Sequence, residues 1–209
     1  MQKLQLICLI VSLLVSSNLQ ASEWKKELKT LLVQDDLQKT ETLATMLAEA
    51  KPPLLQVLDV IKEKPDSKPD YGHHLRMSMC LDGVERPYCI FVPKRKELGS
   101  APLFVYLHGG VTRSEIREEP LAYAENAPFL SLCKERGWFH LTPFGQKGAA
   151  WWDRVGMTNI MRQITIVKSQ YDIDDNRVYL GGFSDGGSAA FCLAMVKPSV
   201  FASFIALNG

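Results

Sequence analysis

A glycine-rich turn near the carboxyl end constrains this chain more than any other stretch. It runs Gly181–Gly187 as GGFSDGG and contains the pattern G-x-S-x-G around Ser184. The β-branched and aromatic run Val178–Leu180 precedes it, and the small residues of Ser188–Met195, which favour a helix, follow it. Side chains in place of the glycines would clash with a neighbouring strand and helix. The pattern is therefore typical of a tight strand-to-helix turn from which the serine projects.

The same glycines do not fit the common phosphate-binding patterns. A P-loop needs a Lys-Ser or Lys-Thr pair after its last glycine, whereas Gly187 is followed by Ser188 and Ala189. The spacing G-x-G-x-x-G of dinucleotide-binding turns is not met either. The remaining alternative is a plain glycine-rich turn with a capping serine.

Short apolar runs alternate with helical segments from about Tyr71 onward. His73–Cys80 and Tyr88–Val92 predict the two arms of a hairpin, and Leu103–Leu107 has the continuous apolar character of a strand buried on both faces. Further strands are expected at residues 138–141, 178–180 and 204–207, each after a helical segment, at residues 121–136, 158–170 and 188–195. The alternation predicts an α/β fold, a mostly parallel sheet with helices on both faces. Ligands of such folds bind at the carboxyl ends of the strands.

The chain begins with the features of a secretory signal peptide at residues 1–21. Lys3 gives a basic start, Leu4–Val15 is almost entirely apolar, and Ala21 suits a cleavage position. An uncleaved membrane anchor is the second interpretation, but a spanning helix needs about 20 apolar residues. We expect a secreted or periplasmic protein with no stable membrane span after signal cleavage.

Residues 22–70 are expected to form a helical extension and linker ahead of the larger domain at residues 71–209. Apolar residues within Ser22–Ile61 recur at helical spacing, with a break at Pro52-Pro53. The stretch Lys62–Asp70, KEKPDSKPD, is too rich in proline and charge to bury a face, which indicates a linker. The extension is either a small accessory or docking element or a set of helices packed on the sheet.

The charge balance argues against nucleic acid as a partner. The chain has 24 Lys plus Arg against 23 Asp plus Glu. Binding to a phosphate backbone needs a strongly cationic surface, which this balance does not predict.

Export would place the cysteines in an oxidising compartment. Cys80 and Cys89 flank the turn sequence Asp82-Gly83 of the expected hairpin, so a disulfide and a pair of buried thiols are both open interpretations. No spacing in the chain gives two close Cys or Cys/His pairs, so no metal site is expected.

A second candidate element is Leu107–Gly110, LHGG, at the end of a buried strand. A serine that attacks a carbonyl generates an oxyanion, which preorganised backbone N–H groups must stabilise, and a glycine turn lets the backbone approach closely. Gly110 would supply one N–H donor, and Asp185, directly after the serine at the start of a helix, would supply the other. His108 and Gly109 would support this oxyanion loop, since His108 is expected beside the oxyanion rather than opposite the serine.

These motifs together resemble those of secreted α/β-hydrolases. The most similar group is that of the polyhydroxybutyrate depolymerases and feruloyl esterase-like enzymes, with prolyl-oligopeptidase-like hydrolases close behind. The resemblance rests on the hairpin ending in Tyr88–Pro93, on YLHGG at Tyr106–Gly110, and on Tyr171–Tyr179 leading into GFSDGG. It runs from roughly Tyr71 to the end. It implies an α/β-hydrolase fold and acyl transfer on Ser184 with no metal or organic cofactor.

In that family the triad follows the order Ser, acid, His, with the last two on loops after later strands. Only Asn208 and Gly209 follow the expected sixth strand, Phe204–Leu207. The expected acid, the His and the last two strands are therefore missing. We expect an N-terminal fragment of a longer enzyme or the product of a truncated gene. Among the upstream histidines, His140 follows a strand whose carboxyl end faces the site, so it is the candidate for a substitute base.

The leading hypothesis is a serine esterase that acts on a small-molecule or polymer ester. A prolyl-oligopeptidase-like peptidase is the alternative enzyme. The missing acid and His favour a third hypothesis, a non-catalytic, truncated or degenerate hydrolase domain. Trp151 and Trp152, in the loop after the fourth strand, would either form an apolar wall for an acyl or aryl group or anchor that loop in the core.

Overall fold

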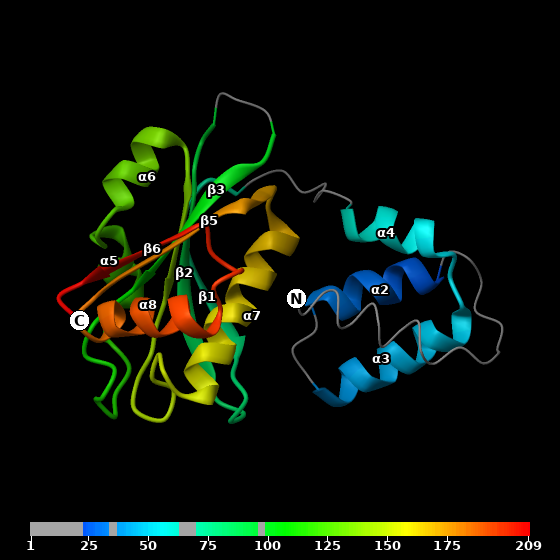
Figure 1. The fold of residues 1–209 in the computed structure, drawn as a ribbon, viewed down its shortest axis with the longest axis horizontal. Coiled ribbons are helices and arrows are strands. Elements are labelled where there is room, and N and C mark those ends of the chain that lie inside the picture. Colours follow the sequence, from blue (N-terminus) through cyan, green and yellow to red (C-terminus); the bar gives the residue numbers. More distant parts are fainter. Residues whose placement is uncertain (1–22, 34–36, 63–69, 96–98) are drawn as a thin grey trace. The chain divides into compact units, whose positions relative to one another are not determined.

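The computed structural model describes residues 23–33, 37–62, 70–95 and 99–209 (Figure 1). The signal peptide predicted at residues 1–21 lies outside the described residues, as does most of the linker predicted at 62–70. The chain divides into two compact units, residues 1–65 and 66–209. In the described parts, no helix combines the length and apolar character needed to cross a membrane.

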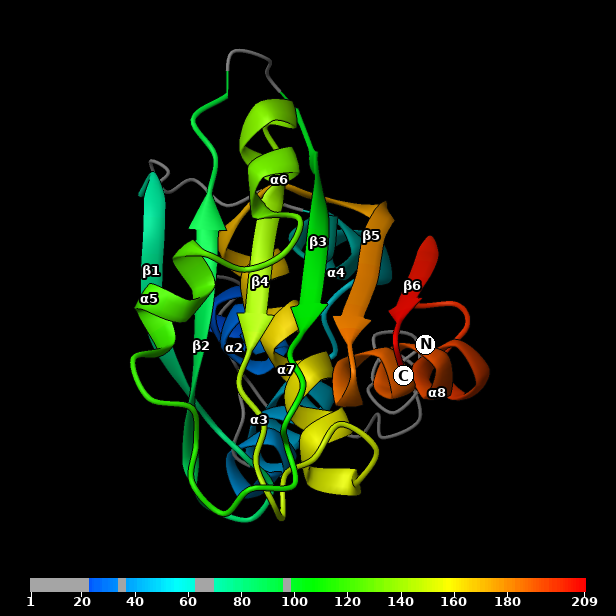
Figure 2. The same ribbon diagram turned by 90° about the vertical axis from the view of Figure 1, so that its left-hand side faces the viewer.

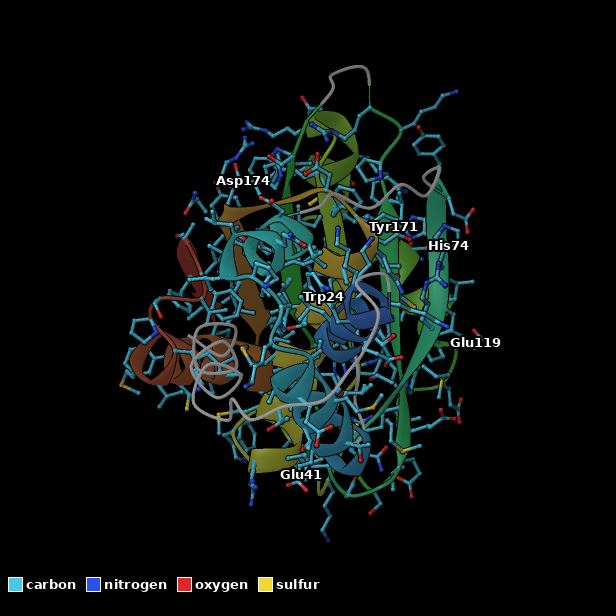
Figure 3. All side chains as sticks on the ribbon, turned by 90° about the vertical axis from the view of Figure 1, so that its right-hand side faces the viewer. Trp24, Glu41, His74, Glu119, Tyr171 and Asp174 are labelled. Atoms are coloured by element: carbon cyan, nitrogen blue, oxygen red, sulfur yellow. The ribbon has the colours of Figure 1, made fainter. Side chains whose placement is uncertain are left out.

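The first unit contains the helices α2 (Glu23–Val33), α3 (Leu37–Ala50) and α4 (Leu54–Lys62). Pro52 and Pro53 separate α3 from α4, because proline lacks the N–H that a helix interior needs. The apolar faces of the helices meet around Trp24, which is labelled in Figure 3. The other buried members of this small core are Leu28, Ala44, Leu47, Val57 and Val60.

The second unit is built on a six-stranded sheet with the order β1-β2-β4-β3-β5-β6 (Figure 2). Its strands are β1 (Gly72–Met79), β2 (Glu85–Val92), β3 (Ala101–Leu107), β4 (Phe139–Pro143), β5 (Ile173–Phe183) and β6 (Ser203–Leu207). The hairpin β1-β2 and the pair β2-β4 are antiparallel, whereas the remaining pairs are parallel. The expected hairpin and the four later strands are confirmed.

Helices cover both faces of this sheet, as the sequence predicts (Figure 2). One face carries α5 (Pro120–Glu125) and α6 (Leu130–Arg136), and the other carries α7 (Arg154–Gln170) and α8 (Asp185–Val196). Strand β3 contributes to both layers, because Leu103, Val105 and Leu107 enter the main core while Phe104 and Tyr106 pack in a second cluster with Cys133 of α6. The central strand is therefore buried on both sides.

The single helix expected over residues 121–136 is two helices in the structure. α5 ends at Glu125, and Phe129, just before α6, has φ 67°. A residue in this left-handed region cannot continue a right-handed helix. Pro128 adds to the break, because the residue before a proline is disfavoured in the helical region.

The structure contradicts the disulfide considered between Cys80 and Cys89 and supports the second interpretation, a pair of buried thiols. Cys80 lies beside the hairpin turn, where its N–H donates to the Val84 carbonyl, while Cys89 pairs with Leu75 further along β1. Each strand residue rises about 3.4 Å, so this register holds the two sulfur atoms far beyond bonding distance. Both are buried free thiols. Burial raises the pKa of Cys89 to about 12 and also raises that of Cys80.

Candidate functional site

Ser184 lies at the turn between β5 and α8, at the carboxyl end of β5. Its backbone has φ 55° and ψ −121°, a strained combination that persists only when the surrounding structure holds it. The Ser184 N–H donates to the Leu207 carbonyl at 2.9 Å, and its own carbonyl accepts the Ser188 N–H at 3.0 Å. The end of β6 and the first turn of α8 therefore fix the backbone of this partly exposed serine.

The glycines around the serine are required by close contacts between backbones. A Cβ on Gly182 would lie 2.1 Å from the Gly186 carbonyl oxygen, and a Cβ on Gly186 would lie 1.9 Å from the Leu107 carbonyl oxygen. A Cβ on Gly187 would lie 2.4 Å from the Leu207 carbonyl oxygen. The turn is thus pressed against the ends of both β3 and β6, which is the steric reason for glycine in G-x-S-x-G.

The loop after β3 reaches the serine, so the two motifs found in the sequence meet at one edge of the sheet. A Cβ on Gly109 would lie 2.9 Å from the Ser184 Cβ and 3.4 Å from its Oγ. The next residue, Gly110, has φ 77°, a conformation that side chains disfavour. Only a glycine pair allows this approach and this bend.

The Asp185 carboxylate holds the donor that the sequence assigned to an oxyanion. Its Oδ2 accepts the N–H of Gly110 at 2.8 Å and the N–H of Val111 at 2.9 Å. The Gly110 N–H therefore points at Asp185 and does not face an open oxyanion hole. The N–H of Asp185 itself is in the first turn of α8 and has no acceptor within the helix. The sequence shows an acidic residue directly after the serine but nothing that links it to a loop 75 residues earlier.

His108 packs beneath the loop and does not contact the Ser184 hydroxyl. Its Nδ1 lies 2.8 Å from the Gly109 carbonyl oxygen, and its Nε2 accepts the Gly145 N–H at 3.3 Å. These partners place the ring proton on Nδ1. Burial lowers the pKa of His108 to about 4, so the ring is neutral at neutral pH and both nitrogens are occupied.

The other three histidines of the chain lie on strands β4 and β1. His140, the residue considered as a substitute base, is buried in β4 with its Nε2 3.0 Å from the Pro128 carbonyl oxygen, and burial lowers its pKa to about 4. His73 and His74 lie on β1, at the opposite edge of the sheet from β6 (Figure 3 labels His74). Within the described residues, no histidine is therefore placed to accept the proton of Ser184.

Trp151 and Trp152 divide the two roles considered for them. Trp151 has no exposed surface, and its Nε1 donates to the His108 carbonyl at 2.7 Å. Its ring also fills the space where Gly145 would carry a Cβ. Trp151 is therefore a loop anchor, the second of the two roles considered for it, because the core surrounds it. Trp152 is 42% exposed.

A cleft of about 470 Å³ opens beside the oxyanion loop. Its lining comprises His108, Gly110 and Gly145 together with Arg113, Glu115, Ile116, Arg117 and Glu118 of the β3–α5 loop. These loop residues were not predicted, because charged residues between two elements are usually only solvated. Among the described residues, no group of three or more His, Cys, Asp or Glu side chains is placed to hold a metal ion.

Comparisons with known proteins show what this chain is similar to. No protein-family model matches the sequence. The bifunctional acetylxylan esterase/xylanase XynS20E of Neocallimastix patriciarum is 28% identical over 130 residues, which are 61% of this chain and 18% of that protein. A thermostable esterase of known structure is 25% identical, with a TM-score of 0.51 over 63% of this chain and 40% of the esterase.

An S-formylglutathione hydrolase of Staphylococcus aureus, FrmB, superposes with a TM-score of 0.53 at 11% identity, over 65% of this chain and 56% of that one. This chain has an α/β-hydrolase fold. It spans less than two thirds of the length of each of these proteins. The α/β-hydrolase fold explains why the serine turn, the loop after β3 and the end of β6 converge at one edge of the sheet.

Proposed function

We propose that this chain is a serine hydrolase of the esterase type, acting on carboxylic esters through an acyl-enzyme on Ser184. The observation that carries the proposal is the strained, partly exposed Ser184, held against Gly109 of the oxyanion loop. The similarity to an acetylxylan esterase/xylanase and to a thermostable esterase supports an ester as the substrate.

The reaction has two steps. The Ser184 Oγ attacks the ester carbonyl carbon, and the tetrahedral oxyanion then collapses by breaking the ester C–O bond, so the alcohol leaves with the serine proton. Water next attacks the acyl-enzyme, which releases the carboxylic acid and restores the serine. The N–H of Asp185 is one donor for the oxyanion. The N–H of Gly110 is held by the Asp185 carboxylate and is not available to the oxyanion in this geometry.

The serine proton needs an acceptor that the four histidines of this chain do not provide. A serine without its base is a weak nucleophile, and removal of a triad member typically leaves only about 10³ to 10⁴-fold catalysis over water. This observation favours a second candidate, a non-catalytic domain with the α/β-hydrolase fold. The second candidate predicts a folded protein with an unreactive serine.

Labelling with a fluorophosphonate distinguishes the two candidates. The proposal predicts that the wild-type chain is labelled, that Ser184→Ala abolishes labelling, and that Ser188→Ala, an exposed serine on the same helix, labels like wild type. A folded wild-type chain that does not react overturns the proposal in favour of the second candidate. Turnover of p-nitrophenyl esters against peptide amides then separates an esterase from the peptidase considered above.

Export belongs to the proposal as well, on the sequence of residues 1–21 alone. We expect the protein to be secreted or periplasmic, with cleavage after Ala21. Amino-terminal sequencing of the exported protein tests this, because a chain that begins at Ser22 supports cleavage and one that retains Met1 contradicts it.

A further inference from the structure

We infer that the cleft beside Gly110 binds a carboxylate carried by the substrate, with Arg117 as its main contact and Arg113 as a second. The substrate class is an ester that bears a free carboxylate, such as a half-ester of a dicarboxylic acid. The inference rests on the proposed esterase function for the ester part, whereas binding of the carboxylate does not depend on turnover.

Arg117 is held in place but uses little of its hydrogen-bonding capacity. Its guanidinium lies over the Tyr123 ring, 4.2 Å from the ring centre, and its Nη2 donates to the Gly109 carbonyl at 3.3 Å. Its Nε is buried and has no hydrogen-bond partner. Among the described residues, no carboxylate pairs with this guanidinium, so its other N–H donors are available to a ligand in the cleft.

The shape of the guanidinium selects the chemistry of the ligand. Its donors form a rigid planar fork that matches the two oxygens of a carboxylate, and hydrogen bonds between two charged groups are about twice as strong as neutral ones. Because stacking on Tyr123 already restricts Arg117, binding orders few additional side-chain torsions. The site is therefore preorganised for a planar anion.

The other charged groups of the cleft leave Arg117 available. Glu115 and Glu118 line the same cleft, but both are exposed, and neither forms an ion pair with Arg113 or Arg117 within the described residues. His108 adds no charge at neutral pH, since burial, with a smaller contribution from the positive charge of Arg117, lowers its pKa to about 4. The cleft is thus lined by two arginines that have no carboxylate partner and by two carboxylates that are exposed to solvent.

The oxyanion loop connects the cleft with the serine, although Ser184 itself does not line the cleft. Gly110 lines the cleft, and the Arg113 Nε lies 3.9 Å from the position of a Cβ on Gly110. The neighbouring Gly109 packs against Ser184 on one side and accepts the Arg117 hydrogen bond on the other. A carboxylate bound at Arg117 would therefore hold a short ester across the loop towards the serine.

Calorimetric titration with two matched esters tests the inference. Monomethyl glutarate carries a free carboxylate, whereas dimethyl glutarate is its neutral counterpart. The full chain and its Ser184→Ala variant, which cannot form the acyl-enzyme, are each titrated with both. We expect the half-ester to bind at least about tenfold tighter than the diester in both proteins, in line with a charge-assisted pair. Equal affinities for the two esters would overturn the inference.

Arginine variants identify the residue responsible. Arg117→Gln should bring the two affinities together, and Arg117→Lys, which keeps the charge but loses the planar fork, should give an intermediate ratio. Arg136→Gln is the matched control, because Arg136 also lies over an aromatic ring, that of Trp138, but outside the cleft. A preference for the half-ester that survives in Arg117→Gln contradicts the assignment of Arg117.

Thermal unfolding shows whether each variant is folded. If Arg117→Gln unfolds because the loop loses its brace, Arg113→Gln and Arg117→Lys decide the question. Both should weaken half-ester binding while diester binding stays unchanged, and unchanged half-ester binding in both overturns the inference. Fluorophosphonate labelling with no ester preference leaves the esterase proposal standing alone. A half-ester preference without labelling leaves an anion-binding domain that is not an esterase.

Discussion

The Asp185 carboxylate accepts the N–H of Gly110 at 2.8 Å and so ties the residue after the serine to the loop after β3. The same oxygen accepts the N–H of Val111 at 2.9 Å. Successive N–H groups around a left-handed residue form a concave anion site, and here an internal carboxylate fills it. Asp185 therefore controls both the order of the loop and the availability of the Gly110 donor.

Replacement of Asp185 should separate its hydrogen bonds from its charge. Asp185→Ala leaves two backbone N–H groups without an acceptor, so we expect the free energy of unfolding to fall by about 1–3 kcal/mol. Asp185→Asn keeps an oxygen that accepts both N–H groups and should lose less than half as much. Urea denaturation measures both variants. An Asp185→Ala variant as stable as wild type would show that the contact does not stabilise the loop.

The limits of prediction from sequence follow from the range of each interaction. The strands and the serine turn were predicted because apolar runs and glycine spacing are local patterns. The hydrogen bonds of Asp185 join it to a loop 74 and 75 residues earlier, and such a contact leaves no local pattern. Trp151 fitted a substrate wall and a core anchor equally well, and only the fold around His108 decided between them. The helix break before Phe129 was signalled by Pro128 but outweighed by helical periodicity.

A methyl group at Gly186 tests the contact between the serine turn and β3. Gly186→Ala would place Cβ 1.9 Å from the Leu107 carbonyl oxygen, so backbone must move. We expect a loss of about 3 kcal/mol or more in the free energy of unfolding, as for severe overpacking. Gly148→Ala is the control, since φ 84° is strained but no atom lies within 4 Å. It should cost about 1–2 kcal/mol. Thermal unfolding that ranks Gly148→Ala as the less stable variant would refute the packing argument.

The strain at Ser184 should be measurable as stability. Its φ of 55° with ψ −121° costs about 1–3 kcal/mol for a residue with a Cβ, while glycine loses about 0.5–1 kcal/mol more chain entropy than alanine on folding. The free energy of unfolding of Ser184→Gly should therefore exceed that of Ser184→Ala by about 1 kcal/mol. Ser184→Gly should accordingly unfold at a higher denaturant concentration. Both variants lack the serine hydroxyl, so the difference between them does not include a contribution from that group. If Ser184→Ala proves the more stable, the turn is not strained.

Two buried histidines should make the protein sensitive to mild acid. Burial lowers the pKa of His108 and of His140 from 6.5 to about 4. Between pH 6.5 and 4 the unfolded chain binds a proton at each site that the folded chain does not, so the free energy of unfolding falls as the pH falls. The stabilising contribution is complete above pH 6.5. Each histidine contributes roughly 3 kcal/mol at most, at 1.36 kcal/mol for each pKa unit.

Urea denaturation at pH 4.5, 5.5, 6.5 and 7.5 checks this dependence, because these pH values lie within and just above the window between pH 4 and 6.5. His108→Asn and His140→Asn each remove one titrating ring, so each should reduce the slope of unfolding free energy against pH by about half of what these two rings contribute together. Asn126→Ala, which removes no titrating group, should keep the wild-type slope. If His108→Asn also keeps that slope, the ring beneath the oxyanion loop is accessible to protons in the folded protein, and the loop is less tightly packed than its contacts with Gly109 and Gly145 indicate.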